Sequence, residues 1–499
     1  MLRNILKDFF LWLIASVICI LWRVIAAKSA IVPYWALFSA MMGIWMVLSF
    51  LFGKYRSYKV AWYWQELLAL LAVTGIEIAL SYIVLPRLSY GLSPVVATWT
   101  VVIVAFIDSI LLLFAHYWKY ASNLTVPPMV IEPREKAQVT RTDEPRSEAS
   151  LETVHQAVLS LTTEEDYQLL LSKAHLDSRQ TKVIANRDRF SILQIPDYQY
   201  LTLVDLTILN EVKGINQRFC MANQKLPDEG IYVCCYRPLD YIKTKLLNAY
   251  PKGINYIVYA YWFLMRRVIP RLMFFSRLYY DLTKGHKRVL SRTEVLGRLY
   301  YCGFEVVEEV YSGHIVYVFA RRHSQPYPQE QFKLYGPIIK LNRVGKNKQI
   351  FAFYKMRTMH PYAEYIQKYV FDQRGGMSIA DKSDSDFRIT AWGRFLRKYW
   401  LDELPMLINW LKRDCKLVGV RPLSQTMFDQ YPPELQDKRT RCKPGLIPPF
   451  YIDHPNDMES LFASENKYLD EYFAHPVKTD CKYFFLTLKS ILFGKMHSA

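Results

Sequence analysis

The sequence predicts a membrane protein of the α + α/β class, in which a helical membrane domain precedes two mixed α/β domains. Of its 499 residues 52% are hydrophobic, yet the mean hydropathy is neutral, so the apolar residues are unevenly distributed. Long apolar stretches occur before residue 120, and runs typical of strands begin only near residue 190. A chain of this length can hold two or three domains.

Four segments near the N-terminus are long and apolar enough to span a bilayer, and they cover residues 8–27, 31–53, 64–85 and 95–118. Basic residues are concentrated before the first span, between the second and third, and after the fourth. The two opposite loops carry only Lys28 and Arg87. By the positive-inside rule we expect both termini, and everything after this four-helix domain (residues 1–120), in the cytoplasm.

Two carboxylates, Glu77 and Asp108, fall deep inside the third and fourth spans. Intramembrane carboxylates often mark ion or substrate paths. We favour the plainer interpretation that both face the interior of the bundle, protonated or hydrogen-bonded to a neighbouring helix. Nothing else in the chain is typical of a transporter, because broken helices and repeated halves are not recognised.

The formal net charge of +18 suits nucleic acid, anionic lipid or a phosphorylated ligand. Membrane spans in the same chain favour lipid headgroups and phosphates, and no nucleic-acid-binding motif is recognised, so we expect no nucleic-acid partner. The eight cysteines form no C-x-x-C pair and do not cluster with histidine. We therefore expect reduced thiols rather than disulfides or a zinc site.

Residues 121–179 are predicted to be a flexible or partly helical linker, because proline and polar residues mingle there and apolar periodicity is lost. A small α/β domain is expected over 180–325. Its predicted elements are strands at 190–195, 200–204 and 230–235, helices near 208–224 and 294–299, and paired strands at 304–309 and 315–320.

This order is similar to the C-terminal half of a class I methyltransferase, which has a Rossmann-like fold. The glycine-rich turn that would hold the nucleoside of the cofactor is absent from the sequence. We therefore expect a domain without a cofactor, and a regulatory nucleotide site stays open as the alternative.

Within this domain, residues 254–280 are dense in Tyr, Trp, Phe and Arg, with Pro270 in the middle. Arg266 and Arg267 disfavour a plain spanning helix, because charge at mid-bilayer is costly. The pattern favours a helix that lies in the membrane interface, or a re-entrant helix that turns back at the proline.

Two adjacent carboxylates, Asp402 and Glu403, stand where a helix is expected to begin. Pro405 suits a first turn, and an apolar run continues to Leu411. A helix N-terminus offers unpaired N–H groups and a positive dipole end, which suit a phosphate. One carboxylate can act as a nucleophile and the other as a Mg²⁺ ligand. A capped surface helix with ordinary charges is the alternative that this pair alone leaves open.

Six short blocks flank the pair in a defined order. They are Arg343-Val344-Gly345-Lys346, Tyr354-Lys355-Met356-Arg357-Thr358-Met359, Asp386-Phe387-Arg388-Ile389-Thr390, Gly393-Arg394-Phe395-Leu396-Arg397, Leu417-Val418-Gly419-Val420-Arg421-Pro422 and Lys443-Pro444-Gly445. In this order the blocks resemble the bacterial sugar transferases that move a hexose-1-phosphate from a UDP-sugar to polyprenyl phosphate. The resemblance covers roughly residues 333–497, and it predicts a mixed α/β, monotopic sugar transferase domain over 326–499.

The resemblance implies a two-step phosphoryl transfer. Asp402 would attack the sugar-bearing phosphorus and release UMP, and undecaprenyl phosphate would then take the phosphosugar from the carboxylate. Glu403 would hold Mg²⁺ against the diphosphate. The expected phosphate contacts are Lys355, Arg394 and Arg421, then Arg357 and Arg388, with Arg397 beside them.

The same resemblance implies a multi-pass protein of the bacterial inner membrane that initiates synthesis of a lipid-linked exopolysaccharide, capsule or O-antigen. Three features depart from the family pattern. The candidate membrane-associated helix ends about 60 residues before the Arg343 block rather than directly before it, and Val420 stands where the family usually has proline. The third is Leu446-Ile447-Pro448-Pro449, which follows the Pro-Gly of the last block.

The competing hypothesis is a non-catalytic membrane scaffold of a glycan-assembly complex. A scaffold would be marked by loss of an acidic or basic position, and the set is intact. The hexose, the pathway, the glycan-assembly partners and the homo-oligomeric state are left open by the sequence.

Overall fold

The computed structural model describes residues 2–27, 32–55, 63–87, 93–123, 137–185, 190–271, 279–283, 286, 288–327, 336–373, 386–453, 455 and 457–492. Lys28 of the charge argument, the first part of the predicted linker and residues 272–278 lie outside these ranges. The chain divides into two compact units, Met1–Thr125 and Val126–Ala499.

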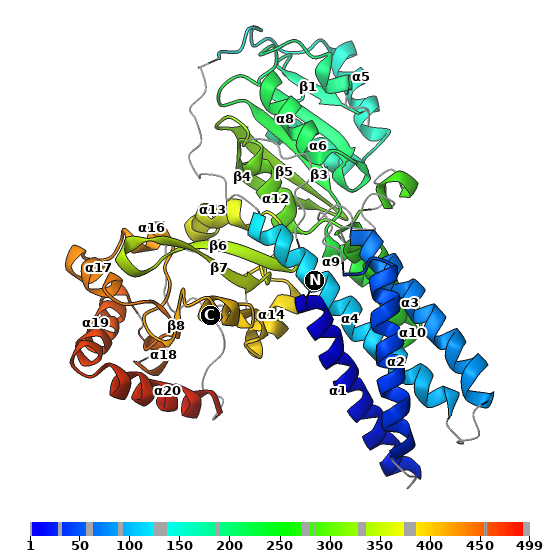
Figure 1. The fold of residues 1–499 in the computed structure, drawn as a ribbon. Coiled ribbons are helices and arrows are strands. Elements are labelled where there is room, and N and C mark those ends of the chain that lie inside the picture. The colour runs from blue at the N-terminus through cyan, green and yellow to red at the C-terminus, as the bar shows by residue number, and fades with distance from the viewer. Residues whose placement is uncertain are drawn as a thin grey trace. The chain divides into compact units, whose positions relative to one another are not determined.

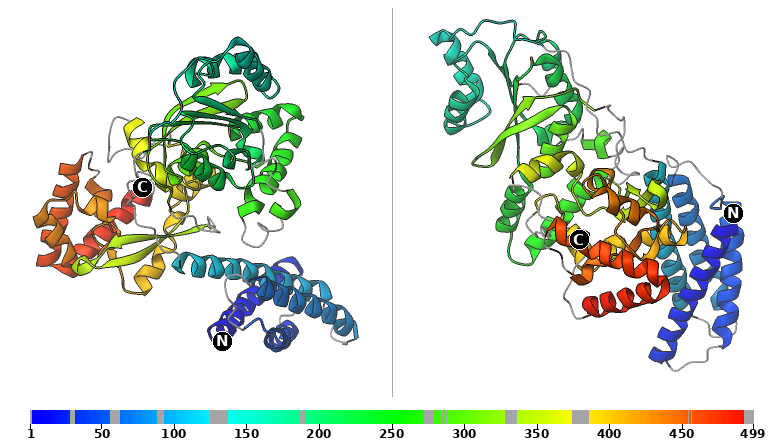
Figure 2. Two further views of the ribbon diagram at one scale, coloured as in Figure 1. Left: turned by 90° about the horizontal axis from the view of Figure 1, so that it is seen from above. Right: turned by 90° about the vertical axis from the view of Figure 1, so that its left-hand side faces the viewer.

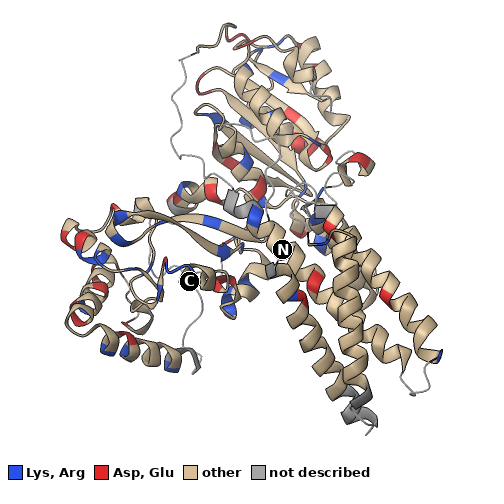
Figure 3. Ribbon diagram, in the orientation of Figure 1, with Lys and Arg blue, Asp and Glu red and all other residues tan. Residues whose placement is uncertain are grey.

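Four long helices form the first unit (Figures 1 and 2). They are α1 (Leu2–Ala27), α2 (Val32–Leu51), α3 (Tyr63–Val84, extended by the 3-10 turn η2, Leu85–Arg87) and α4 (Pro94–Asn123). Each is long and apolar enough to cross a membrane, which confirms the four predicted spans. Charged residues are sparse along most of their length (Figure 3).

Both intramembrane carboxylates face the interior of this bundle, as predicted. Glu77 is 2% exposed and Asp108 is fully buried. Lys54 lies 2.5 Å from Asp108 and donates to buried Asp8 at 2.6 Å, and Lys7 also binds Asp108. Two lysines therefore balance two aspartates, and Asp108 is held in an ion-pair network.

A five-stranded mixed sheet forms the centre of the middle region, with the strand order β1-β2-β3-β5-β4. The first three strands run parallel, and β4 and β5 form an antiparallel hairpin. The strands are β1 (Thr181–Ile184), β2 (Thr202–Ile208), β3 (Ile231–Tyr236), β4 (Phe304–Ser312) and β5 (Ile315–Arg322). The predicted strand at 230–235 and the predicted hairpin are confirmed. The hairpin turns at Gly313, whose φ of +52° favours glycine.

One prediction in this region was wrong, and a second was confirmed only in part. The run at 190–195 forms the short helix α7 (Phe190–Leu193) rather than a strand, and Ile192 and Ile195 turn to the core. A short apolar run fits the periodicity of a helix as well as that of a strand, so the sequence alone does not distinguish the two. The helix expected near 208–224 is divided into a 3-10 turn, η3 (Leu209–Glu211), and α8 (Ile215–Lys225).

The second half of the predicted linker is ordered and helical. Helices α5 (Glu148–Leu159) and α6 (Glu164–Ala174) bury Val158, Tyr167 and Leu170 against one face of the sheet. Helix α6 also begins with a capping box at Thr163. The prediction of a flexible or partly helical linker over 121–179 is therefore confirmed in its helical alternative for this part, where a narrow apolar face is enough to dock two helices.

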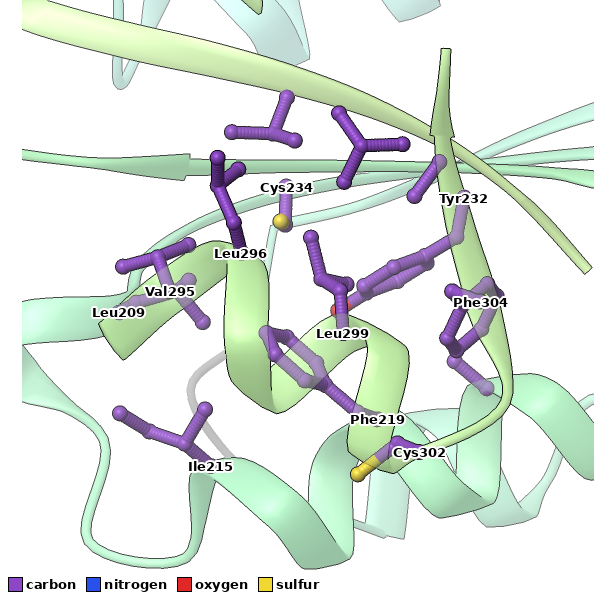
Figure 4. Packing of buried hydrophobic residues seen from close by; sticks show 14 of the residues in the cluster. Leu209, Ile215, Phe219, Tyr232, Cys234, Val295, Leu296, Leu299, Cys302 and Phe304 are labelled. Carbon is purple, nitrogen blue, oxygen red and sulfur yellow. The ribbon is translucent and has the colours of Figure 1, made fainter. Parts of the chain in front are cut away.

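The opposite face of the sheet is covered by α8 and α12 (Arg292–Tyr301). Phe219 and Leu299 pack around Tyr232 of β3 (Figure 4). Residues of the following region, Tyr362, Ile366 and Val370, complete the same core. The stretch from Tyr362 to Val370 thus packs into the core of the sheet, whereas the rest of the predicted 326–499 domain has apolar clusters of its own.

Between β3 and α12 lie α9 (Leu239–Ala249) and α10 (Ile254–Phe263), which continues as a π-helical turn, η4 (Leu264–Val268), and a 3-10 turn, η5 (Ile269–Arg271). Helix α9 buries none of its residues, and α10 exposes an apolar face that includes Tyr256, Ile257 and Tyr261. Arg267 is buried at the end of this segment and pairs with Glu294 of α12 at 2.8 Å.

The C-terminal region is built on two small sheets. Strands β6 (Ile338–Val344) and β7 (Ile350–Met356) form an antiparallel ribbon, and β8 (Lys416–Val418) and β9 (Gly445–Ile447) pair in parallel. The surrounding elements are η6 (Lys346–Lys348), η7 (Ala363–Ile366), α13 (Gln367–Gln373), α14 (Ala391–Lys398), η8 (Leu401–Glu403), α15 (Met406–Leu411), α16 (Gln425–Phe428), α17 (Pro433–Thr440), α18 (Phe450–Asp453), α19 (Met458–Ala474) and α20 (Pro476–Leu492).

Candidate active site

The two adjacent carboxylates lie in the 3-10 turn η8, and α15 begins only at Met406. Trp400 precedes them with a φ of 59°, a left-handed conformation that lets the chain reverse between α14 and α15. The expected helix begins just after the pair rather than at it, since α15 has six residues and its N-cap position is Pro405 without a side-chain cap. A strong helix dipole at the pair is therefore not part of the site.

The carboxylate of Glu403 forms an ion pair with the ammonium group of Lys355. Lys355 Nζ donates to Glu403 Oε1 at 2.8 Å, and both side chains are less than one-fifth exposed. The neighbouring Asp402 is 2% exposed. Sequence analysis selected all three residues, and the structure brings them together from β7 and η8, which are separated by more than 40 residues along the chain.

Helix α14 places Arg397 beside this pair. Thr390 caps the helix by accepting from Gly393 N at 2.8 Å, and Arg397 Nε donates to Thr358 Oγ1 at 3.1 Å. Burial lowers the pKa of Arg397, and the negative charge of Asp402 opposes that shift. The guanidinium therefore lies within the electrostatic reach of the candidate nucleophile.

The charge of Arg421 acts on two other arginines, Arg343 and Arg397. Burial lowers the pKa of Arg343 to about 10, and the charge of Arg421 adds to this effect. Arg421 also lowers the pKa of Arg397. Like charges that act on one another favour binding of an anion. Sequence analysis quoted Arg343 only as part of a motif block and did not select it as a site residue.

The remaining predicted phosphate contacts have other positions. Arg388 is buried and binds Asp386 through two nitrogen atoms, with Nη2 at 2.7 Å from Oδ2. Arg357 Nε donates to Gly336 O at 2.9 Å. Arg394 lies on the exposed side of α14. Arg388 thus binds a neighbouring carboxylate and Arg357 a backbone carbonyl. Their predicted contact with phosphate stays a prediction, as does that of Arg394.

An apolar surface borders the carboxylates on both sides along the chain. On α14, Trp392 stacks on Phe395 with 5.3 Å between ring centroids, and Phe395 contacts Tyr399 at 4.9 Å. All three rings are at least 46% exposed. The surface continues after the carboxylates with exposed Leu404, Leu407, Trp410 and Leu411. The spacing of the aromatic residues along one face of α14 was the sequence signal for this surface, and it was not used.

A Mg²⁺ site of protein ligands alone is not formed by the described residues, in which no three His, Cys, Asp or Glu side chains cluster suitably. Mg²⁺ is commonly held by one or two carboxylates together with substrate phosphates. Asp402 and Glu403 supply such carboxylate oxygen atoms beside a cationic group of arginines, so the donor set fits a metal that arrives with a diphosphate.

Comparison with known proteins identifies the C-terminal region. The bacterial sugar transferase family model matches residues 331–494. An uncharacterized sugar transferase of Bacillus subtilis, EpsL, is 32% identical over 165 residues, which are 32% of this chain and 73% of that protein. This chain therefore belongs to the bacterial sugar transferase family.

Two longer relatives are similar over the same region. The galactosyl transferase CpsE of Streptococcus agalactiae is 37% identical over 163 residues, 32% of this chain and 35% of that protein. The undecaprenyl-phosphate galactose phosphotransferase of Salmonella typhimurium is 36% identical over 121 residues, 23% of this chain and 25% of that protein. The chain thus matches about a third or less of the length of these two relatives.

Proposed function

We propose that this protein is a polyprenyl-phosphate hexose-1-phosphate transferase. It transfers the hexose 1-phosphate of a UDP-sugar to undecaprenyl phosphate, releases UMP and starts a lipid-linked exopolysaccharide, capsule or O-antigen. The observation that carries this proposal is the placement of a buried aspartate and a lysine-bound glutamate beside arginines and next to an exposed apolar surface. Such a site suits a phosphate ligand that is attached to a lipid.

The chemistry follows from the roles of these residues. The Asp402 carboxylate attacks the sugar-bearing phosphorus, the bond to the bridging oxygen breaks, and UMP leaves with that oxygen. A phosphate oxygen of the polyprenyl phosphate then attacks the same phosphorus and frees Asp402. Arg343, Arg397 and Arg421 bind phosphate oxygens, and Lys355 holds Glu403 in place. Glu403 would hold Mg²⁺, which supplies charge neutralisation on the diphosphate when bound.

The lipid acceptor reaches the site over the apolar surface of α14 and α15. Cations on the same two helices, Arg394, Lys398 and Lys412, suit anionic headgroups. The α9–α10 segment rests in the membrane interface by its exposed tyrosines, since amphipathic aromatic rings favour that layer. The protein is a multi-pass protein of the bacterial inner membrane, and its C-terminal region lies in the cytoplasm.

The test is UMP release by the full chain in membranes with undecaprenyl phosphate, Mg²⁺ and each of several UDP-sugars. We expect release with one sugar and a loss of at least about a thousandfold in Asp402→Asn. Asp429→Asn is the matched control, because Asp429 is exposed and its carboxylate accepts a local hydrogen bond from Gln425. Release that survives in Asp402→Asn would overturn the role of this carboxylate.

A second experiment separates the two steps. With a UDP-sugar labelled in the sugar-bearing phosphate and no lipid acceptor, the wild type should keep up to one acid-stable label per chain. Asp402→Asn should keep none. Failure of every UDP-sugar in both experiments, from folded protein, would favour the scaffold hypothesis instead.

A further inference from the structure

We propose that Asn409 is a positioning residue of this site, and the proposal rests on the function proposed above. Its side-chain amide binds the free edge of β7 in the way that a third strand would. The bond fixes α15, and with it the turn that carries Asp402 and Glu403, in one register against Lys355. Asn409 itself touches no reacting atom.

The geometry of the amide carries this inference. Asn409 is fully buried in α15. Its Nδ2 donates to Ala352 O at 2.6 Å, and its Oδ1 accepts from Tyr354 N at 3.2 Å. Nδ2 also donates to Asp414 Oδ2 at 3.2 Å. Nδ2 thus faces two acceptors and Oδ1 faces one donor. This arrangement fixes which end of the side-chain amide carries the nitrogen.

The strand needs such a partner. In the described part of the chain the β6–β7 sheet has two strands, so β7 has one edge without a strand beside it. Ala352 and Tyr354 are two residues apart, so their polar backbone groups point to the same edge. A buried N–H or C=O left without a bond costs about 1–3 kcal/mol. The amide of Asn409 supplies one donor and one acceptor and satisfies both groups.

Apolar packing alone would not set this register. Helix α15 is six residues long and exposes Leu407 and Leu411, and Met406 packs with Phe353 in a small cluster. Apolar contacts are non-directional and tolerate small shifts, whereas the two hydrogen bonds do not. Lys355 directly follows Tyr354, so a shift of the strand along α15 would separate Lys355 Nζ from Glu403.

The first test compares Asn409→Leu with Asn223→Leu in the full chain. Asn223 is also fully buried and donates to two backbone carbonyls, but it lies in α8. We expect both variants to lose thermal stability, and only Asn409→Leu to lose about a hundredfold in kcat for UMP release, because small misplacements at a site have effects of this size. Similar kcat values in the two variants would overturn the proposal.

The second test uses Asn409→Asp. A protonated Asp at this position would donate to Ala352 O and accept from Tyr354 N, whereas the carboxylate could only accept. Its activity relative to the wild type should therefore be higher at pH 6 than at pH 8. A ratio that does not change with pH would contradict the proposal.

A third measurement does not depend on activity. Hydrogen exchange at the Tyr354 amide should be faster in Asn409→Leu than in the wild type, and acylation of the Lys355 amine should also be faster. If wild-type protein releases no UMP, the proposed function fails, while this measurement still tests the positioning role of Asn409. Unchanged exchange and unchanged labelling would overturn that role.

Discussion

The ammonium of Lys355 on β7 lies 2.8 Å from Oε1 of Glu403, and this contact joins the strand to the turn that also carries Asp402. Replacing Lys355 by Met removes the charge and keeps much of the apolar volume. We expect kcat/KM for UMP release to fall about 10²–10³-fold, the range seen when one preorganised electrostatic contact is removed from a site. Steady-state kinetics with the accepted UDP-sugar checks this.

Lys348→Met is the matched control for that variant. Lys348 is in the same region and pairs with Asp437 at 2.7 Å, but both side chains are more than half exposed. Exposed pairs contribute little, so activity should stay within about twofold of the wild type. An equal loss in both lysine variants would show that net charge, and not the contact with Glu403, is responsible.

The loss of Arg343 should have opposite effects on stability and on binding. Its guanidinium is penalised by burial and by the charge of Arg421, so Arg343→Gln should raise the melting temperature of the unliganded protein. The same variant should bind UMP more weakly. At about 100 times its Kd, UMP should stabilise the wild type by about 2.7 kcal/mol, and the variant at the same concentration by less. Thermal unfolding with and without UMP measures both; equal UMP effects would contradict the role in binding.

Gly393 allows α14 to contact the end of β7. A Cβ at this position would lie 2.0 Å from Thr358 O, a backbone atom that also accepts from Thr390 N. Gly393→Ala should therefore displace α14 and with it Arg397. We expect the free energy of unfolding to fall by about 1–3 kcal/mol and kcat to fall as well. Gly43→Ala is the control, because no atom lies within 4 Å of a Cβ there and alanine favours a helix interior. A normal kcat in Gly393→Ala would show that the position of α14 does not matter.

The sequence predicted those elements whose signal is local. Four apolar segments and the hairpin around Gly313 were recognised because length, composition and turn chemistry determine them. The packing of α5 and α6 on the sheet was missed, because their apolar face becomes visible only against the sheet that they cover. The core shared by α12 and Tyr362 was missed for the same reason, since it joins residues more than 60 positions apart.

The candidate site shows the same division. Motif order selected Lys355, Asp402 and Glu403, and the structure places them together. Arg388 was selected as a phosphate contact because it is basic, yet Asp386, only two residues away, binds it. Asn409 was not noticed, because a single asparagine in an apolar run forms no sequence pattern. Nothing in the sequence distinguishes a buried asparagine that binds a strand from one on the surface.

Breaking the buried ion pair between Arg439 and Glu465 should make the stability of the protein depend on pH. Arg439 Nε lies 3.2 Å from Oε2 of Glu465, and both side chains are at most 3% exposed. Burial raises the pKa of Glu465, and the charge of Arg439 opposes the rise. In Arg439→Met that opposition is lost, so the pKa of Glu465 should rise further and the folded protein should take up a proton.

The pKa of glutamate in the unfolded chain is about 4.3. A folded state in which this pKa is raised binds more protons than the unfolded state, so the protein loses stability as pH rises from about 4.3 towards the raised pKa. Arg439→Met should therefore cost about 3–5 kcal/mol at pH 8 and less at pH 5. The double variant Arg439→Met, Glu465→Gln should recover part of the loss at pH 8, because no charge is then left buried. Thermal unfolding of the full chain at both pH values measures these differences. An equal loss at pH 5 and pH 8 would mean that packing of the Arg439 side chain, and not its charge, stabilises this region.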